Sequence, residues 1–332
     1  MFLKEFIYRF FSNLINFNLY LKKNSNTEYI YSNKISFGDI FTFCIENYFK
    51  IKNKKIKIII FSKLEKKITK LFFKKKIIEE LLILIPNFIP TYRISFLLKS
   101  KKYFNPPETC NLHEAKLKVQ NKHKNLLTRI LNNNTYHISP ELVKFQYEKY
   151  YLIFIKHYDK NKNSINDAHS RATSNLKKVY RLINFLSKNK VIILGDKKDK
   201  SYKILKNYYK NKKNIFFFQD LSKNQSMIDQ LFVHYYATLA IGSASGAFIM
   251  SIYLKKRIIF FDTLKFEINK NSLLISKNIK NIFKKIIYNK KEEVFSDKHV
   301  NFFLNKKNIL KNKYHIKENS FYEIKKAIIN KF

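Results

Sequence analysis

Short apolar runs alternate with helical patterns in the second half of this chain, and this alternation constrains the fold more than any other feature. Five runs have the length and residue types of buried strands: 150–155, 191–194, 215–218, 237–241 and 257–261. The segments between them, such as 171–188, carry apolar residues at helical spacing. Strands that alternate with helices over short joints form a parallel sheet with helices on both faces. The sequence therefore predicts a doubly wound α/β domain whose ligands lie beyond the carboxyl ends of its strands.

The first half of the chain shows weaker patterns of the same kind. Residues 41–49 are expected to form a helix, 57–61 and 81–85 two strands, and 111–131 a largely helical segment. This mixture is typical of a further α/β domain.

The passage between the two halves is marked by asparagines and prolines at 132–148. We therefore expect two Rossmann-like domains that face each other across a cleft, residues 1–145 and residues 146–332. The second is the clearer doubly wound sheet. A capping box from Ser320 to Glu323 predicts a helix at its end.

Glycine is scarce, and its placement points to a ligand. The chain has four glycines, and Gly242 and Gly246 enclose Ser243-Ala244-Ser245 between a strand pattern and a helix-like stretch, 247–254. A glycine-serine turn that opens a helix offers unpaired amides, hydroxyl donors and partial positive charge to an anion. The alternative is that both glycines only shape a strand-to-helix turn.

Composition adds a strong positive charge. Lysine and arginine number 66 against 24 aspartates and glutamates, which gives a formal net charge of +42. Such a charge suits nucleic acid or an anionic membrane as a partner. The abundance of Lys, Asn, Ile, Phe and Tyr, all with AT-rich codons, offers a base-composition explanation instead. We favour that explanation and do not expect nucleic acid as the partner.

Cysteine usage and hydropathy bear on the compartment. Cys44 and Cys110 are the two cysteines, which fits a reducing cytosol rather than a disulfide framework or a zinc site. No apolar stretch has the length that spans a bilayer. The apolar segment 1–21 either lies in a membrane interface or packs as an ordinary helix. We expect a cytoplasmic protein that can attach to the inner membrane face, an anionic surface, through this segment and its charge.

Several motifs of nucleotide and metal chemistry are absent. The sequence has no G-x-G-x-x-G, no P-loop and no D-x-D pair. His157, Asp159 and His169 share one loop, but their spacing is not that of a metal site. Ala244 stands where a G-x-S-x-G hydrolase has its nucleophile, which argues against that class. We expect no metal and no cofactor.

Four parts of the chain carry a family resemblance: 154–158 with 169–172, 191–196, 229–261 and 318–324. The family has a strand ending in an arginine-aspartate pair, a tyrosine-arginine pair that opens a long helix, a strand close to V-I-R-M-G, and an aspartate-led helix before a small-residue turn. In these features the chain is similar to GT-B-type glycosyltransferases of surface-polysaccharide gene clusters. Lys156, His157 and Leu194 replace the family's arginine, aspartate and arginine, whereas Arg171 is retained.

The resemblance implies transfer of a sugar from a nucleotide-diphosphate donor to a surface-glycan or lipid-linked acceptor, without a metal. The second domain would bind the donor and the first the acceptor. Candidate diphosphate ligands are Arg171, Lys156, Gly242, Ser243, Ser245 and Gly246. Candidate nucleoside contacts are Gly195, Asp196 and Asp229, and candidate catalytic groups are Asp39, His157 and His169. Asp159 is a further candidate base, and helix capping is an alternative role for Asp229.

Two other classes of function stay open. One is a basic RNA-binding or RNA-modifying protein, which the charge and an aromatic content of 16% allow, although no stacking module is present. The other is a different transferase, or an inactive relative, on the same scaffold. A steep salt dependence of RNA affinity would favour the first, whereas selective binding of a nucleoside diphosphate favours glycosyl transfer.

Overall fold

The chain forms two compact units, residues 1–115 and residues 116–332. The computed structural model describes residues 28–31, 36–51, 56–60, 63–75, 78–80, 119–157, 172–197, 199–222, 226–264, 276–288, 291–296 and 314–330. In this division the segment 116–145 lies with the second unit. The arrangement of the two units across a cleft stays a prediction.

The first unit contains a three-stranded parallel sheet with two connecting helices. Its elements are β1 (Glu28–Tyr31), α2 (Phe37–Ile51), β2 (Ile56–Ile60), α3 (Lys63–Phe72) and β3 (Ile78–Glu80), and the strand order is β1-β2-β3. Helix α2 buries an almost continuous apolar run that includes Phe41, the free Cys44 and Ile45. The predicted strand at 81–85, Cys110 and the segment 1–21 lie outside the described residues. The described part of this unit is therefore α/β, as expected.

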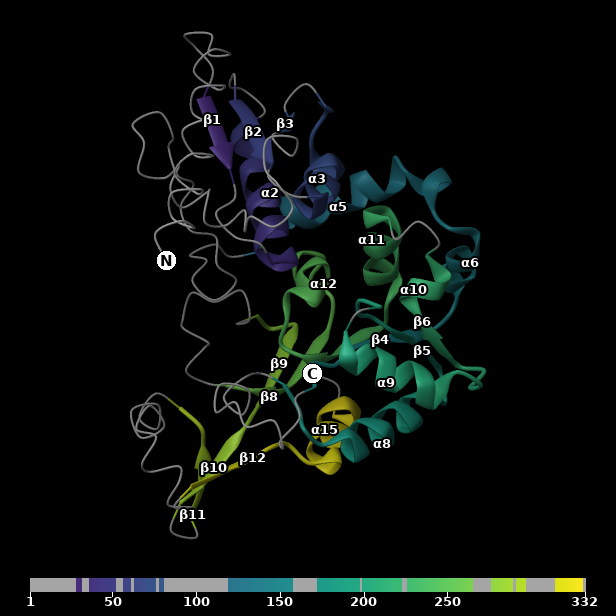
Figure 1. Cartoon of the computed structure of the whole chain (residues 1–332), viewed down its shortest axis with the longest axis vertical. Coiled ribbons are helices and arrows are strands. Elements are labelled where there is room, and N and C mark those ends of the chain that lie inside the picture. Colours follow the sequence, from purple (N-terminus) through teal and green to yellow (C-terminus); the bar gives the residue numbers. More distant parts are fainter. Residues whose placement is uncertain are drawn as a thin grey trace, which may run out of the picture. The chain divides into compact units, whose positions relative to one another are not determined.

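The second unit is built on a six-stranded sheet, shown in Figure 1. Its strands are β4 (Tyr150–Phe154), β5 (Lys190–Ile193), β6 (Ile215–Phe217), β7 (Leu239–Ser243), β8 (Ile258–Thr263) and β9 (Ile279–Phe283). They lie in the order β6-β5-β4-β7-β8-β9, and every neighbouring pair is parallel. The predicted doubly wound parallel sheet is confirmed, and β9 adds a strand that the sequence patterns did not indicate.

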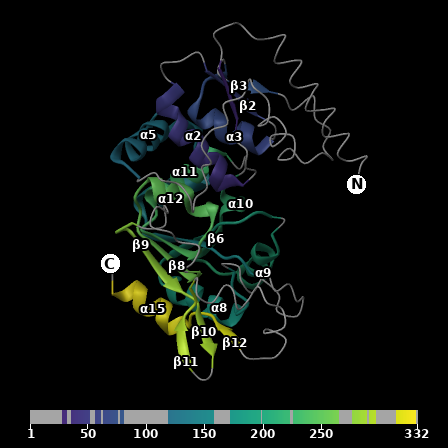
Figure 2. The same cartoon turned by 90° about the vertical axis from the view of Figure 1, so that its left-hand side faces the viewer.

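Helices cover both faces of this sheet, as Figures 1 and 2 show. One face packs against α8 (Leu176–Leu186), α9 (Lys200–Tyr209) and α15 (Phe321–Ile329), whose apolar sides share one core with alternate strand residues such as Ile153 and Ile241. The other face is covered by α11 (Met227–Tyr236) and α12 (Ile249–Tyr253), and α5 (Asn121–Asn132) packs against these two helices. On that face Tyr150 donates a 2.7 Å hydrogen bond to the Val233 carbonyl, and Phe248 packs on Phe260. Alternating strand residues thus serve two cores, which explains why the strands read as continuous apolar runs.

Short elements complete the second unit. They are η3 (Thr135–His137), α6 (Pro140–Val143), η4 (Lys144–Tyr147), α10 (Phe218–Leu221) and η6 (Gly246–Phe248), with a three-stranded antiparallel sheet β11-β10-β12 (Lys291–Val294, Lys285–Tyr288, Tyr314–Lys317). The predicted capping box is present at the start of α15, where Ser320 and Glu323 cap each other's amides. None of the helices in the described part of the chain has the length and hydropathy of a membrane-spanning segment.

Candidate functional site

The strand order defines one crevice at the carboxyl edge of the second unit's sheet. Strand β4 is central, and the chain runs from it through β5 to β6 on one side, then crosses to β7, β8 and β9 on the other. The connections after β4 and β7 therefore leave the sheet on opposite sides, and the crevice between them is where doubly wound sheets hold ligands. The residues at this crevice are Lys156 and His157 after β4, and Ser243 to Gly246 at the end of β7.

Gly242 is required by the close approach of these two strands. A Cβ atom at this position would lie 1.9 Å from the Phe154 carbonyl oxygen, and the Gly242 φ angle of +157° is one that other residues rarely adopt. The next residue, Ser243, is fully buried, and its Oγ accepts a 3.0 Å hydrogen bond from the Lys156 amide. These two residues hold β4 and β7 together at the crevice.

The turn after β7 is capped by its own serine. Ser245 Oγ accepts from the Ala247 amide at 3.3 Å, and the Ser245 carbonyl accepts from the Phe248 amide at 3.1 Å. Instead of one helix over the helix-like stretch 247–254, the chain forms the 3₁₀ turn η6 followed by the short helix α12. Among the described residues, the half-buried amides of Ser245 and Gly246 donate to no other group. These two amides remain able to bind an anion.

The segment after β4 presents a cation and an oriented imidazole. The Lys156 side chain is exposed, while its carbonyl accepts from the Thr173 amide at 2.8 Å. His157 is half-buried, and its Nδ1 lies 2.9 Å from the Thr173 carbonyl oxygen. A carbonyl oxygen only accepts, so Nδ1 carries the proton and, in the neutral ring, Nε2 keeps its lone pair. The local backbone thus sets the His157 tautomer that can act as a base.

Thr173 also fixes the return of the chain to this edge. It forms a parallel bridge with His157, and the His157 amide donates to Ser201 Oγ at 3.3 Å. The segment 158–171 between the bridged residues lies outside the described residues, and with it three candidates, Asp159, His169 and Arg171. Their roles stay predictions.

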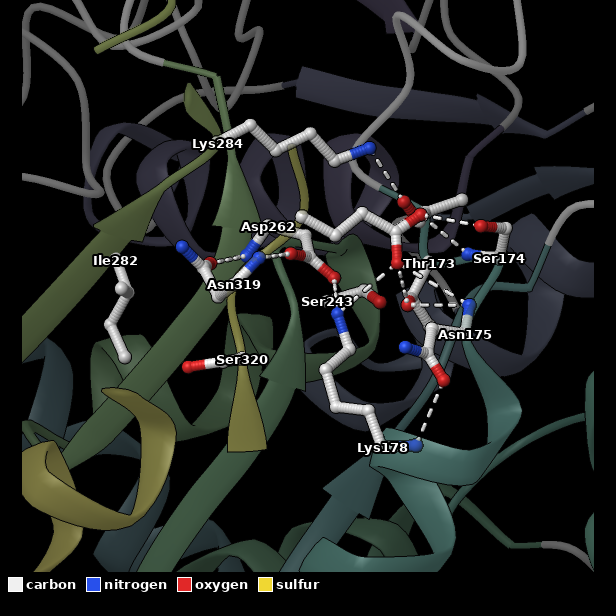
Figure 3. Close-up of polar contacts among 12 residues, drawn as sticks. Thr173, Ser174, Asn175, Lys178, Ser243, Asp262, Ile282, Lys284, Asn319 and Ser320 are labelled. Carbon is white, nitrogen blue, oxygen red and sulfur yellow. Dashed lines mark hydrogen bonds and ion pairs between the residues drawn. The ribbon is translucent and has the colours of Figure 1, made fainter. Parts of the chain in front are cut away.

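Next to this edge lies a buried cluster of two cations and two carboxylates, shown in Figure 3. Lys178 Nζ on α8 lies 2.6 Å from Asp262 Oδ2 at the end of β8 and 3.2 Å from Glu318 Oε2 before α15. Lys178 and Asp262 are almost inaccessible, at 3% and 0% side-chain exposure. Lys284, also buried, donates to the Ala172 carbonyl at 2.8 Å. Because Lys178 contacts both carboxylates and Lys284 contacts a backbone carbonyl, the cluster ties together segments that are distant in the sequence.

Glu318 is the most heavily engaged member of the cluster. Its oxygens accept from Thr173 Oγ1 (2.8 Å) and from the amide and hydroxyl of Ser174 (2.7 and 2.8 Å). Burial alone would raise the pKa of this carboxyl, but Lys178, the Ser174 and Thr173 hydrogen bonds and Lys284 together lower the pKa to about 2. Glu318 is therefore ionised at neutral pH, and it anchors the residues that follow the 158–171 segment.

Asp262 closes the cluster from the side of β8. Its backbone has a left-handed φ of 54°, and its Oδ1 accepts from the Asn319 amide at 2.7 Å while Asn319 Oδ1 accepts from the Asp262 amide at 2.5 Å. Burial raises the pKa of Asp262, against the opposing effect of Lys178. This reciprocal pair joins β8 to the start of α15.

The nucleoside candidates differ in accessibility. Asp229, in the first turn of α11, is fully buried, and its carboxylate accepts from the amide (2.8 Å) and hydroxyl (2.7 Å) of Ser139 and from the Ser222 hydroxyl (2.6 Å). Asp196 is exposed after β5. Gly195 lies under α9, since a Cβ atom there would be 2.7 Å from Tyr202 Cδ2, and its carbonyl accepts from Gln219 Nε2 at 2.8 Å. The Asp229 carboxylate is thus occupied by Ser139 and Ser222, whereas Asp196 is exposed, and the nucleoside role of both stays a prediction.

The remaining catalytic candidate, Asp39, belongs to the first unit. It lies in the first turn of α2, where its Oδ2 accepts from Ser36 Oγ at 2.7 Å and its amide donates back to that oxygen at 3.3 Å. The structure therefore brings together Lys156, His157 and the turn at Ser245 and Gly246, and it places Asp39 in a helix cap. Within the described ranges no group of three or more His, Cys, Asp or Glu side chains could hold a metal ion.

Sequence patterns did not single out the cluster of Lys178, Asp262, Glu318 and Lys284. One signal was available for Asp262, which directly follows a buried strand pattern, and one for Glu318, which precedes the capping box. Lys178 lies next to Val179 on the buried side of α8, where a charged residue requires a partner. The partners themselves come from distant parts of the chain.

Comparison with known proteins finds similarity in structure only. No protein-family model and no curated protein sequence matches this chain. E. coli heptosyltransferase WaaC with ADP is similar at 10% identity over 83% of this chain and 98% of that one, with a TM-score of 0.37. Methanocaldococcus jannaschii UDP-GlcNAc 2-epimerase in complex with UDP-GlcNAc and UDP is similar at 12% identity over 92% and 99%, with a TM-score of 0.45. A family 9 glycosyl transferase from Veillonella parvula is similar at 8% identity over 78% and 85%, with a TM-score of 0.41. Likeness at this level does not carry a function from one protein to another.

Proposed function

We propose that the protein is a glycosyltransferase whose second unit binds a nucleotide-diphosphate sugar at the crevice between β4 and β7. The supporting observation is the combination found there: an exposed cation at Lys156, the amides of Ser245 and Gly246, which donate to no group in the described part of the chain, and the oriented ring of His157. The crevice lies at the point of a doubly wound sheet where ligands bind. The resemblance of the sequence to GT-B-type enzymes supports the same reaction.

The diphosphate of the donor is proposed to lie between the two strand ends. As the bond from the sugar to the diphosphate breaks, negative charge develops on the departing phosphate oxygen, and donors fixed in advance stabilise it. The Ser245 and Gly246 amides would donate to one phosphate and the Lys156 ammonium to the other. Arg171, two residues before Thr173 in the sequence, is proposed as a second cation.

His157 is proposed as the general base. Its Nε2 takes the proton of the acceptor hydroxyl, the hydroxyl oxygen forms a bond to the anomeric carbon, and the diphosphate leaves with the electron pair of the broken bond. The hydrogen bond from Nδ1 to the Thr173 carbonyl stabilises the imidazolium that results. Glu318 accepts hydrogen bonds from Thr173 and Ser174, and Lys178 joins Glu318 to Asp262. These three residues are proposed to position the ring without touching the substrate.

The acceptor is proposed to be a surface glycan or a lipid-linked sugar, bound by the first unit. The charge of +42 would keep the protein close to anionic headgroups if the acceptor is carried on a lipid.

A panel of nucleotide sugars, tested first by thermal shift and then for turnover, examines the proposal. A true donor at 100 times its dissociation constant adds roughly 2.7 kcal/mol of stability. His157→Gln should retain donor affinity and lose turnover by about 100-fold or more, as expected for a lost general base. Lys177→Gln is the control variant, because it changes an exposed lysine on α8 and shows the effect of a substitution away from the crevice. Full turnover in His157→Gln would remove His157 from catalysis, and no stabilisation by any donor would contradict the function.

A further inference from the structure

A second concave site lies at the opposite, amino edge of the same sheet. A cavity of about 390 Å³ is lined by residues that include Lys124, Tyr235, Thr238, Lys255, Lys256 and Arg257. Thr238 and Arg257 directly precede β7 and β8, and Lys124 comes from α5, which packs beside α11 and α12 (Figure 2). Parallel strands begin at one edge and end at the other, so this amino-edge pocket is separate from the crevice between β4 and β7.

Four of the lining residues are cations and none is an acid. The half-buried Lys256 directs its Nζ to the Tyr235 carbonyl at 2.8 Å, and Lys255 directs its Nζ to Asn121 Oδ1 at 2.7 Å. Both acceptors are neutral, and in the described part of the chain neither lysine is in an ion pair. Each ammonium has three donors, so two on each lysine remain for a ligand.

Lys255 occupies a backbone position that normally selects glycine. It follows α12 with a φ of 56°, and the end of the helix is closed by the Lys255 amide on the Ile252 carbonyl (3.0 Å) and the Lys256 amide on the Ser251 carbonyl (2.9 Å). This is the Schellman arrangement, in which the left-handed residue is usually glycine. The Lys255 carbonyl also accepts from Asn278 Nδ2 at 2.7 Å. A strained residue that its surroundings hold in place is a candidate for a functional one.

The cations of this pocket also repel each other. Burial lowers the pKa of Lys256, and the charge of Lys124 lowers the pKa further. An anion between them would relieve this repulsion and pair with donors that now contact only neutral groups.

We propose that the amino-edge pocket binds a phosphate-bearing anion, a phosphomonoester or a diphosphate, either free or as the headgroup of a lipid. The volume lies at the lower end of the range for small-molecule pockets, which suits a compact polyanion. A nucleic-acid site would instead need a basic track along which several phosphates bind. Charged donors converging from α5 and from the turn after α12 match a single multiply charged group.

Titration calorimetry of the full chain with inorganic pyrophosphate tests this proposal. Lys255→Gly removes one cation while it relieves the left-handed strain, so the variant should fold at least as stably as the natural chain. We expect its affinity for pyrophosphate at this pocket to fall about tenfold, and Lys256→Met to show a similar loss. Lys212→Gln, an exposed lysine in the turn before β6, should bind like the natural chain.

Two further experiments distinguish the two binding sites from each other and a free phosphate from a lipid headgroup. Because the carboxyl-edge crevice is itself proposed to bind a diphosphate, the titration is repeated in Lys156→Gln, in which the amino-edge pocket should be unchanged. Phosphatidylcholine vesicles with and without phosphatidic acid show whether the phosphate comes from a lipid, since only a headgroup ligand makes sedimentation depend on Lys255. Pyrophosphate affinity equal to the natural chain in both Lys255→Gly and Lys256→Met would overturn the proposal. The proposal would also be overturned if Lys255→Gly and Lys256→Met weakened the binding of RNA but left the affinity for pyrophosphate unchanged.

Discussion

The strongest test of the buried cluster is the change Glu318→Gln. Glu318 is a carboxylate that accepts four hydrogen bonds, from Thr173, both donors of Ser174 and the Asn175 amide, and that contacts Lys178. A neutral amide keeps the size of the side chain but loses the charge, and its NH₂ group would face donors. Lys178 would be left with Asp262, and the segment at 173–175 would lose its anchor.

The size of the effect follows from proton affinity. The pKa of Glu318 falls from an ordinary 4.5 to about 2 in the folded protein, and at 1.36 kcal/mol per tenfold change in affinity this is worth about 3 kcal/mol at pH 7. A carboxyl whose pKa is lowered by folding stabilises the protein above its unfolded pKa, and the contribution is lost as pH falls from about 4.5 towards 2. The natural chain should therefore exceed Glu318→Gln in free energy of unfolding by a gap that narrows with acidity. Relative to pH 7, this gap should be smaller by about 1 kcal/mol at pH 4 and by about 2 kcal/mol at pH 3. Asp262, whose pKa folding raises, acts in the opposite direction but is present in both chains.

Urea unfolding followed by circular dichroism and tyrosine fluorescence measures this gap, since the chain has 22 tyrosines and no tryptophan. Asp220→Asn is the control, because it breaks the exposed pair with Lys206 and should cost less than about 1 kcal/mol at every pH. A gap between the natural chain and Glu318→Gln that stays constant from pH 7 to pH 3 would refute the reasoning, as would a gap below about 1 kcal/mol at pH 7.

Three further predictions concern other parts of the second unit. Gly242→Ala should prevent this unit from folding, because its Cβ would lie 1.9 Å from a backbone oxygen. Gly195→Ala should fold with a lower melting temperature, because its Cβ would lie 2.7 Å from a side-chain atom that can move. A melting temperature of Gly242→Ala equal to that of the natural chain would contradict the first expectation. Asp229→Asn should lower the free energy of unfolding by about 1–3 kcal/mol and leave nucleotide affinity unchanged, since Ser139 and Ser222 already occupy its carboxylate; weaker nucleotide binding at full stability would show instead that it contacts the ligand. Turnover should persist in chelator, and activity that returns only with added magnesium or manganese would show that the diphosphate needs a metal.

Much of the second unit's fold could be predicted from its sequence because the strands β4, β5, β7 and β8 are buried along most of their length. The apolar runs that become β4, β5, β7 and β8 stand out against a lysine- and asparagine-rich background. Strands β9 to β12 were not predicted, because residues such as Lys280, Lys285 and Glu292 interrupt any apolar pattern there. The crevice was predictable in outline, since strand ends of a parallel sheet meet at one edge.

The details of the site were not predictable from local patterns. Gly242 lets the Phe154 backbone approach, although the two residues are 88 positions apart in the sequence. The sequence alone does not show whether a glycine is required by a neighbouring strand or by a ligand. The cluster depends on contacts between residues 84 and 140 positions apart, Lys178 with Asp262 and Lys178 with Glu318. Only the folded topology brings such pairs together.

The most direct test of the central claim is the binding of nucleoside diphosphates to the natural chain, to Lys156→Gln and to Lys177→Gln. Both lysines are exposed and carry the same charge, but only Lys156 lies at the crevice between β4 and β7. Calorimetry with a panel of nucleosides and their diphosphates should show that Lys156→Gln weakens the diphosphate by about tenfold and leaves the bare nucleoside unchanged, whereas Lys177→Gln affects neither. Equal affinity of Lys156→Gln and the natural chain for the diphosphate, or no binding of any nucleoside diphosphate, would contradict the account.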